Sequence, residues 1–250
     1  MGLAVILFGI FLFHTTPVSG APECLVGKAA SCAKGLICAK INAKGETACL
    51  EERPEAPLVL EFPFKGPIEV ECTQGIQNPQ GTHGFSNILF ALDLRTDYAR
   101  PPGTIKASVD GTVYTFSECK APKGTPSQSD IDNCGMGFGN YVNIVTNTGH
   151  VVLFAHLADV AVKDGQTVKK GAVLGTEGAT GQAGHRHLHW QVTELGPSPE
   201  KEQKAKPASG RSVPFRFAVV DKNGKRKTIS VTDLHCPHSN HSDVRIFSKE

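Results

Sequence analysis

The sequence predicts an all-β protein, built mostly of antiparallel sheet with hairpins and preceded by a small disulfide-rich module at the N-terminus. Three observations support this fold class. Apolar residues occur in short blocks or alternate with polar ones, and Gly, Pro, Asn and Asp separate these blocks. No segment repeats its apolar residues at the helical period over several turns. Four of the eight cysteines lie within residues 24–49.

Residues 1–20 predict a secretory signal peptide. The apolar run Leu3–Phe13 is too short to span a bilayer, and the small residues Ser19 and Gly20 follow it. No Lys or Arg precedes the run, so a short hydrophobic anchor is the alternative. We expect a protein that is secreted, or periplasmic if its source is a Gram-negative bacterium, without stable insertion in a membrane.

The eight cysteines suit an oxidising compartment because their number is even. The first four predict a stapled module over residues 21–52, which is too small to fold on an apolar core alone. Their spacings lack the close pairs of a zinc knuckle, so we expect disulfides within this set, in one of three connectivities. The later cysteines are expected to pair as Cys119–Cys134 and Cys72–Cys236.

A polar, Pro-bearing linker is expected at residues 53–57, and the main domain at 58–250. Two connections in the main domain, Asp110-Gly111 and Asn147-Thr148-Gly149, have the residues of tight hairpin turns. The polar stretch from Glu194 to Arg211 is rich in Lys, Pro and Ser and is expected to be an exposed loop. The expected strands cover residues 58–62, 68–72, 105–109, 112–116, 141–145, 151–155, 187–193 and 214–220.

The charge pattern argues against a nucleic-acid partner. The net charge is +2 and the lysines are scattered along the chain. Proteins that bind nucleic acid usually concentrate basic residues on one face. We therefore expect no nucleic-acid partner.

Two histidines on one expected strand, His187 and His189, are the first candidate site residues. Side chains two positions apart on a strand point to the same face, so these imidazoles project together. Leu188 and Trp190 are then expected to pack on the opposite face. Such a pair is a weak signal on its own because it is common on protein surfaces.

A single carboxylate, Asp93, stands within the apolar run from Phe90 to Leu94. Burying a carboxylate is costly unless the group is paired or binds a metal ion. A strand-end turn residue is the weaker alternative. Two further histidines accompany it: His83 lies upstream, and His156 follows the strand expected at 151–155.

These segments together resemble peptidase family M23, the LytM and lysostaphin-like zinc peptidases. The resemblance runs from about Cys72 to Glu194, roughly half of the chain, and its pieces occur in the order of the family. The matching pieces are His83 with Ala91-Leu92-Asp93, Val109–Val113, Gly139–Val142, Phe154–Leu157, Val168–Gly175 with Gly178–Gly181, and His187–Trp190.

The resemblance implies a core like that of lipoyl domains and other duplicated hybrid motifs, with one zinc ion per chain. It implies that His83, Asp93 and His189 bind the zinc and that His156 and His187 form the catalytic pair. The expected activity is endopeptidase cleavage of glycyl or D-alanyl bonds in peptidoglycan cross-links. Two imidazoles and one carboxylate suit a catalytic zinc, since they leave a coordination position open.

The chain departs from the family pattern in two places. Nine residues separate His83 from Asp93 where three are commonest, although some relatives carry a longer spacing. The segment before His187 reads Ala183-Gly184-His185-Arg186 and lacks the usual Pro. We assign neither His185 nor His150 to the metal, and leave open which of His156 and His187 acts as the base.

Three alternatives remain at this point. One is a catalytically silent binding protein on the same scaffold, which the presence of all five site residues disfavours. Another is a zinc peptidase that acts on Gly-rich extracellular proteins. The third is a carrier domain, because Thr167–Gly175 looks like lipoyl and biotinyl domains, but no tip with a modifiable lysine is present.

Overall fold

A computed structural model of the protein describes residues 24–26, 28, 32–41, 44–52, 54–78, 81–122, 127, 131–195, 201–237 and 244–250. The expected signal peptide lies outside these residues. Strands dominate the described chain, as predicted, and its one α-helix is the short α1 (Lys201–Ala205). Within this part of the chain, no helix has the length and apolar character needed to cross a membrane.

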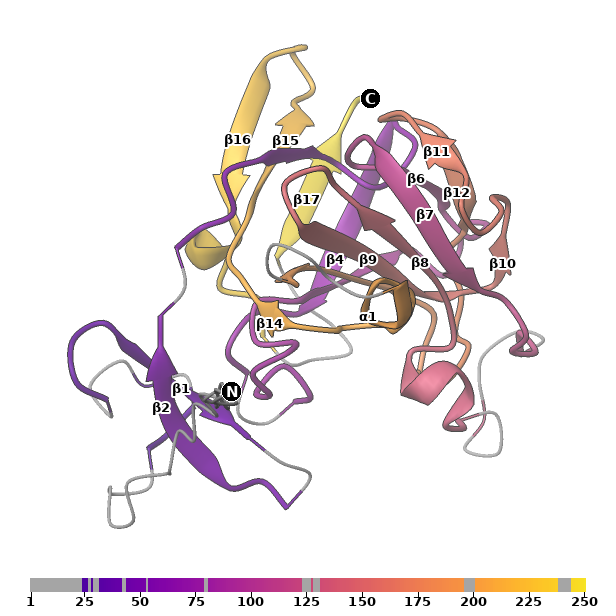
Figure 1. Ribbon diagram of the computed structural model, residues 1–250. Helices are drawn as coiled ribbons and strands as arrows, with labels where there is room; N and C mark the ends of the chain where they lie inside the picture. Colours follow the sequence, from indigo (N-terminus) through magenta and orange to yellow (C-terminus); the bar gives the residue numbers. More distant parts are fainter. Residues whose placement is uncertain are drawn as a thin grey trace, which may run out of the picture.

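A large antiparallel sheet forms the centre of the main domain (Figure 1). Its strands follow the spatial order β11-β7-β8-β9-β13-β5-β4-β17, and β14 pairs with β13 outside this path. The strand bounds are β11 Thr167–Val168, β7 Gly111–Phe116, β8 Asn140–Val145, β9 His150–Leu157, β13 Leu188–Glu194, β5 Leu92–Thr96, β4 Ile68–Gln74, β17 Arg245–Ser248 and β14 Arg211–Ser212.

Two smaller sheets accompany the large one. The first contains β10 (Asp159–Val160), β12 (Val173–Thr176) and β6 (Thr104–Lys106). The second contains β16 (Arg226–Ser230), β15 (Arg216–Val220) and β3 (Val59–Glu61), with β3 and β15 parallel.

Alternation along β13 places its two faces in different surroundings. Leu188, Trp190 and Val192 are fully buried in the main apolar core. The Trp190 ring lies 5.0 Å from Phe215 and 5.3 Å from Phe217, both in edge-to-face contact. His189 therefore points to the opposite face, as the period of two predicts.

One predicted hairpin is wrong and the other is confirmed. The segments flanking Asp110-Gly111 do not pair, because β6 joins β12 whereas β7 lies between β11 and β8. Gly111 serves close packing instead of a turn, since a Cβ atom there would lie 2.5 Å from the Val145 carbonyl oxygen. The second hairpin, β8 to β9, forms around Gly149, whose φ of 78° suits glycine.

The prediction of an exposed loop between Glu194 and Arg211 is only partly right for residues 201–211, since Glu202, Gln203 and Lys206 are exposed but Pro207 and Ala208 are buried. The segment packs on the large sheet through its backbone carbonyls. Tyr141 Oη donates to the Ala205 carbonyl at 2.9 Å, and Asn143 Nδ2 donates to the carbonyls of Lys204 and Lys206, both at 2.9 Å. Polar composition alone does not reveal such a partnership, because the buried donors belong to β8.

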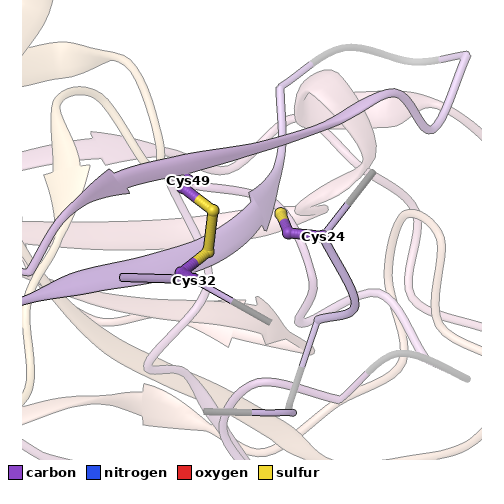
Figure 2. A group of neighbouring side chains, drawn as sticks. All are labelled: Cys24, Cys32 and Cys49. Carbon is purple, nitrogen blue, oxygen red and sulfur yellow. A yellow bond between two sulfur atoms is a disulfide. The ribbon is translucent and has the colours of Figure 1, made fainter. Parts of the chain in front are cut away.

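The disulfides agree with the predicted grouping. The N-terminal set pairs as Cys24–Cys38 and Cys32–Cys49, which selects one of the three connectivities, and the others are Cys72–Cys236 and Cys119–Cys134. Figure 2 shows the Cys32–Cys49 bond beside Cys24. These sulfur atoms lie close together, but each is bonded to another sulfur and is no thiolate ligand.

The N-terminal module consists of a two-stranded sheet, β1 (Leu36–Lys40) and β2 (Thr47–Glu51), and it contacts the main domain. The Lys40 amide donates to the Gly84 carbonyl at 2.7 Å, and the Ser86 amide donates to the Lys40 carbonyl at 3.2 Å. Leu89 and Phe90 pack against Cys24 and Cys38. In the expected linker, Ala56 is buried in the main core and its amide donates to the Pro214 carbonyl.

Candidate metal centre and catalytic site

Asp93 and His189 face each other across two neighbouring strands. They are direct register partners in the β5–β13 pair, so their side chains lie on the same face. His189 Nδ1 lies 3.0 Å from Asp93 Oδ1. Both side chains are buried. Strand pairing alone brings these two residues together.

His83 reaches the same point from the irregular segment between β4 and β5. Its Nε2 lies 3.3 Å from Asp93 Oδ1 and 3.3 Å from His189 Nδ1. Its Nδ1 lies 3.0 Å from the Gly75 carbonyl oxygen. A carbonyl oxygen only accepts, so Nδ1 carries the proton and the lone pair of Nε2 points at Asp93.

This donor set fits a divalent cation. The ligand atoms of His83, Asp93 and His189 lie within 4.8 Å of one another. Burial alone would raise the pKa of Asp93, but His83, His187 and His189 outweigh it and hold the pKa well below its usual value. Nitrogen and carboxylate oxygen are the ligands that zinc prefers, and a cation between them removes the repulsion of converging lone pairs.

His156 is the penultimate residue of β9 and has an unusual backbone conformation. Its φ of 62° is rare for a residue with a side chain and costs roughly 1–3 kcal/mol, a strain that tends to occur at functional sites. Its Nδ1 lies 2.8 Å from the Thr180 carbonyl, so that nitrogen donates and Nε2 is left unprotonated. Burial, assisted by His187 and His189, lowers the pKa of His156 well below 6.5.

His187 stands immediately before β13 and lies beside His156, with ring centroids 4.7 Å apart. Its Nδ1 lies 2.8 Å from the His185 carbonyl, so Nε2 is again the nitrogen without a proton. That Nε2 lies 3.8 Å from Asp93 Oδ1. The His187 amide donates to the Gly178 carbonyl at 3.0 Å. A Cβ atom at Gly178 would lie 2.2 Å from the backbone nitrogen of Ala158, so this position has no room for a side chain.

A surface cavity opens onto this group. Four of the five predicted site residues line it, and His83 lies behind them with none of its surface exposed. The remaining lining residues are polar or small. The full lining is Thr73, Gln74, Thr82, Asp93, His156, Gln182, Gly184, His185, His187 and His189.

The two histidines left out of the metal assignment occupy different places. His185 lines the cavity, with its ring 4.7 Å from that of His187. His150 begins β9, opposite Glu194, and its Nδ1 lies 3.0 Å from Thr148 Oγ1. Neither belongs to the group of converging ligand atoms.

The hydrogen-bond partners that orient the four imidazoles were not predicted from the sequence. Three of them are backbone carbonyls, those of Gly75, Thr180 and His185, which leave no side-chain signal. The fourth is the side chain of Gln191, 3.0 Å from His189 Nε2. It stands two residues after His189, so the strand period could have suggested it.

Part of the chain matches a known protein family. Residues 94–204 match the model of peptidase family M23. The matched range includes His156, His187 and His189, whereas His83 and Asp93 precede it.

Several curated proteins resemble parts of the chain. It is 40% identical over 95 residues to the cell division protein DipM of Caulobacter vibrioides, covering 35% of this chain and 15% of that protein. It is 30% identical over 129 residues to the peptidoglycan DD-endopeptidase ShyC of Vibrio cholerae, covering 51% and 26%. It is 35% identical over 146 residues to the DD-carboxypeptidase/endopeptidase Mpg of Neisseria meningitidis, covering 53% and 30%.

The chain thus spans less than a third of the length of these relatives.

Among solved structures, the catalytic domain of lysostaphin from Staphylococcus simulans aligns with 54% of this chain and 84% of its own length, at 23% identity and a TM-score of 0.36. The domain that contains residues 94–204 is that of peptidase family M23.

Proposed function

We propose that this protein is an exported zinc endopeptidase that hydrolyses glycyl or D-alanyl bonds in the peptide cross-links of peptidoglycan. One observation carries the proposal. Three ligand atoms from His83, Asp93 and His189 converge beside a surface cavity, and His156 and His187 flank that cavity with Nε2 unprotonated. The names of two relatives, peptidoglycan DD-endopeptidase and DD-carboxypeptidase/endopeptidase, support the substrate class.

Three side chains would hold one zinc ion: His83 through Nε2, Asp93 through a carboxylate oxygen and His189 through Nδ1. When bound, zinc lowers the pKa of the attacking water to about 7 and polarises the scissile carbonyl. Two imidazoles and one carboxylate leave room for both water and substrate.

His156 and His187 would handle the proton. Each ring donates from Nδ1 to a backbone carbonyl, so each has Nε2 available as a base. The low pKa of His156 keeps it neutral near pH 7. One member of the pair would take the proton of the attacking water and return it to the leaving amine. The protonated member could then stabilise the developing oxyanion.

One glycine that lines the cavity, Gly184, supports the proposal of a substrate with small side chains. Of the glycines in the segment from Gly175 to Gly184, three serve internal packing, because a Cβ atom at Gly175, Gly178 or Gly181 would lie within 2.4 Å of a backbone atom. Gly184 lines the cavity, and the nearest atom to a Cβ there would be Ile131 Cδ1 at 4.0 Å. An extended peptide could approach closely at Gly184.

The direct test is to incubate the purified protein with peptidoglycan, a pentaglycine peptide and a Gly-rich matrix protein, each with and without a chelator. We expect new amino groups from the first two, loss of activity with chelator and recovery with zinc. Elemental analysis should find one zinc per chain. Cleavage of the matrix protein alone would contradict the cell-wall assignment. Binding to peptidoglycan without release of amino groups would favour the silent binding protein.

A further inference from the structure

Gln191 is a fully buried side chain of β13 that the proposed catalytic steps do not use. It shares the face of His189, two residues earlier. Its Oε1 lies 3.0 Å from His189 Nε2, and its Nε2 donates to the Asn87 carbonyl at 3.1 Å. The amide thus links a candidate ligand on the sheet to the irregular segment that also contains His83.

The orientation of this amide follows from its second partner. The Asn87 carbonyl oxygen can only accept, so the NH₂ group of Gln191 must face it. Oε1 then faces His189 and can only accept in turn. His189 Nε2 must therefore carry a proton, and in a neutral ring the lone pair is on Nδ1. Nδ1 is the nitrogen that lies 3.0 Å from Asp93 and 3.3 Å from His83 Nε2.

We propose that Gln191 is a positioning residue that selects the tautomer and ring orientation of His189, so that Nδ1 is the atom offered to the metal. This inference rests on the proposed zinc site. Groups that hydrogen-bond to the far nitrogen of a ligand histidine also raise its basicity. The hydrogen bond to the Asn87 carbonyl also connects the His189 ring to the segment that contains His83. The Asn87 side chain in turn donates to the Ala208 carbonyl.

The contrast between two variants tests this proposal. Gln191→Met keeps the length of the side chain but removes the acceptor, whereas Gln191→Glu keeps an acceptor for His189 Nε2. Thr193→Val is the matched control, because Thr193 is the next buried residue on the same face of β13. We expect Gln191→Met to weaken zinc binding by about 10–100-fold, and Gln191→Glu to restore most of it. The control should bind zinc as the parent protein does.

Zinc affinity is measured by competition with a chromogenic chelator, and folding of each variant by circular dichroism. Heteronuclear NMR of the imidazole nitrogens supplies a readout that a space-filling role would not move. In the unaltered protein, with and without zinc, His189 should carry a proton on Nε2 that is protected from exchange. Gln191→Met should lose that protection, and Gln191→Glu should keep it.

Two results would overturn the inference. One is unaltered zinc affinity and Nε2 protection in Gln191→Met. The other is a deprotonated His189 Nε2 in the unaltered protein, which decides the matter even if Gln191→Met does not fold. Failure of the unaltered protein to bind zinc would instead count against the proposed function, and the Nε2 proton would still be tested in the metal-free protein.

Discussion

The candidate metal centre is assembled from two regions of different construction. Asp93 and His189 are register partners in the middle of the large sheet, where strand pairing determines their separation. His83 belongs to the irregular segment 81–91, and its ring is oriented by one backbone carbonyl, that of Gly75. The comparison teaches that two of the three candidate ligands follow from regular secondary structure, while the third depends on how a loop is packed.

The N-terminal module is part of that packing. It bonds to Gly84, the residue after His83, and its Cys24–Cys38 disulfide shares a buried apolar cluster with Leu89 and Phe90 at the end of the same segment. From the other side, Ser212 Oγ accepts from the Phe90 amide at 3.0 Å. We therefore expect changes in the module to affect the His83 side of the site before they affect the Asp93–His189 pair.

The largest effect should come from the start of β13 and the residue just before it, which together supply both kinds of candidate residue. His189→Ala removes a proposed ligand and should abolish stable zinc binding together with activity. His187→Ala should retain zinc and lower kcat by about 10²–10⁴-fold, the usual contribution of a general acid or base. Metal content and kcat are measured on both variants. Equal retention of zinc by the two would show that ligand and catalyst are wrongly assigned.

A smaller effect is expected at the loop-built side. The double variant Cys24→Ser/Cys38→Ser opens a loop with a sequence separation of 14, which costs the module about 3 kcal/mol. Because Leu89 and Phe90 lose a packing partner, zinc affinity should fall roughly tenfold, as for other losses of support around a ligand. Chelator competition measures it.

The variant for comparison is Cys119→Ser/Cys134→Ser, which opens a loop of nearly the same size, with a sequence separation of 15. This disulfide adjoins the other imidazole ligand, because Cys134 precedes Phe138, whose ring lies 5.4 Å from that of His189. The imidazole NMR signals of His83 should therefore change most in the first variant, and those of His189 in the second. If both double variants change the same signals equally, the module has no specific link to His83, and general destabilisation explains the loss.

Stability should also depend on pH through His185, which lies on the loop before β13. Burial, followed by the nearby His187 and Arg95, lowers the pKa of His185 from 6.5 to about 4. The unfolded chain binds a proton at this group near pH 6.5 and the folded chain only near pH 4. Its contribution to stability is therefore complete above pH 6.5 and is lost as the pH falls from 6.5 to 4.

His185→Asn should reduce that dependence. Thermal unfolding of the chelator-treated protein between pH 7 and pH 4 measures the effect without interference from zinc loss. The melting temperature of the variant should fall less over this interval than that of the parent protein. Parallel curves for the two proteins would place the acid sensitivity elsewhere, in the buried His156 for example.

The smallest structural effect is expected at Gly184, on the same loop. A Cβ atom there has room, so Gly184→Ala should change the free energy of unfolding by no more than about 0.5 kcal/mol. If the substrate backbone passes this residue, kcat/KM for pentaglycine should still fall several-fold. Unchanged kinetics would show that the peptide approaches the site from another side of the cavity.

The sequence by itself determined the features that follow from local periodicity and composition. The period of two placed His189 opposite Leu188 and Trp190, and the cost of an isolated buried carboxylate singled out Asp93. Cysteine grouping separated the N-terminal pairs from the later ones, because four cysteines lie close together in the sequence within residues 24–49. The Asn147-Thr148-Gly149 hairpin was predictable since its turn requires a positive φ at Gly149.

Only the tertiary structure decided which strands pair and what surrounds each imidazole. The predicted Asp110-Gly111 hairpin does not form, because β7 pairs with β8 and β11 instead. Gly111 therefore packs against the backbone of Val145, a residue distant in sequence. Residues 201–208 pack on the sheet because the backbone carbonyls of Lys204, Ala205 and Lys206 accept hydrogen bonds from buried side chains of β8. The partners of His83 and His156 are backbone carbonyls, which any residue can supply, so no residue type marks them in the sequence.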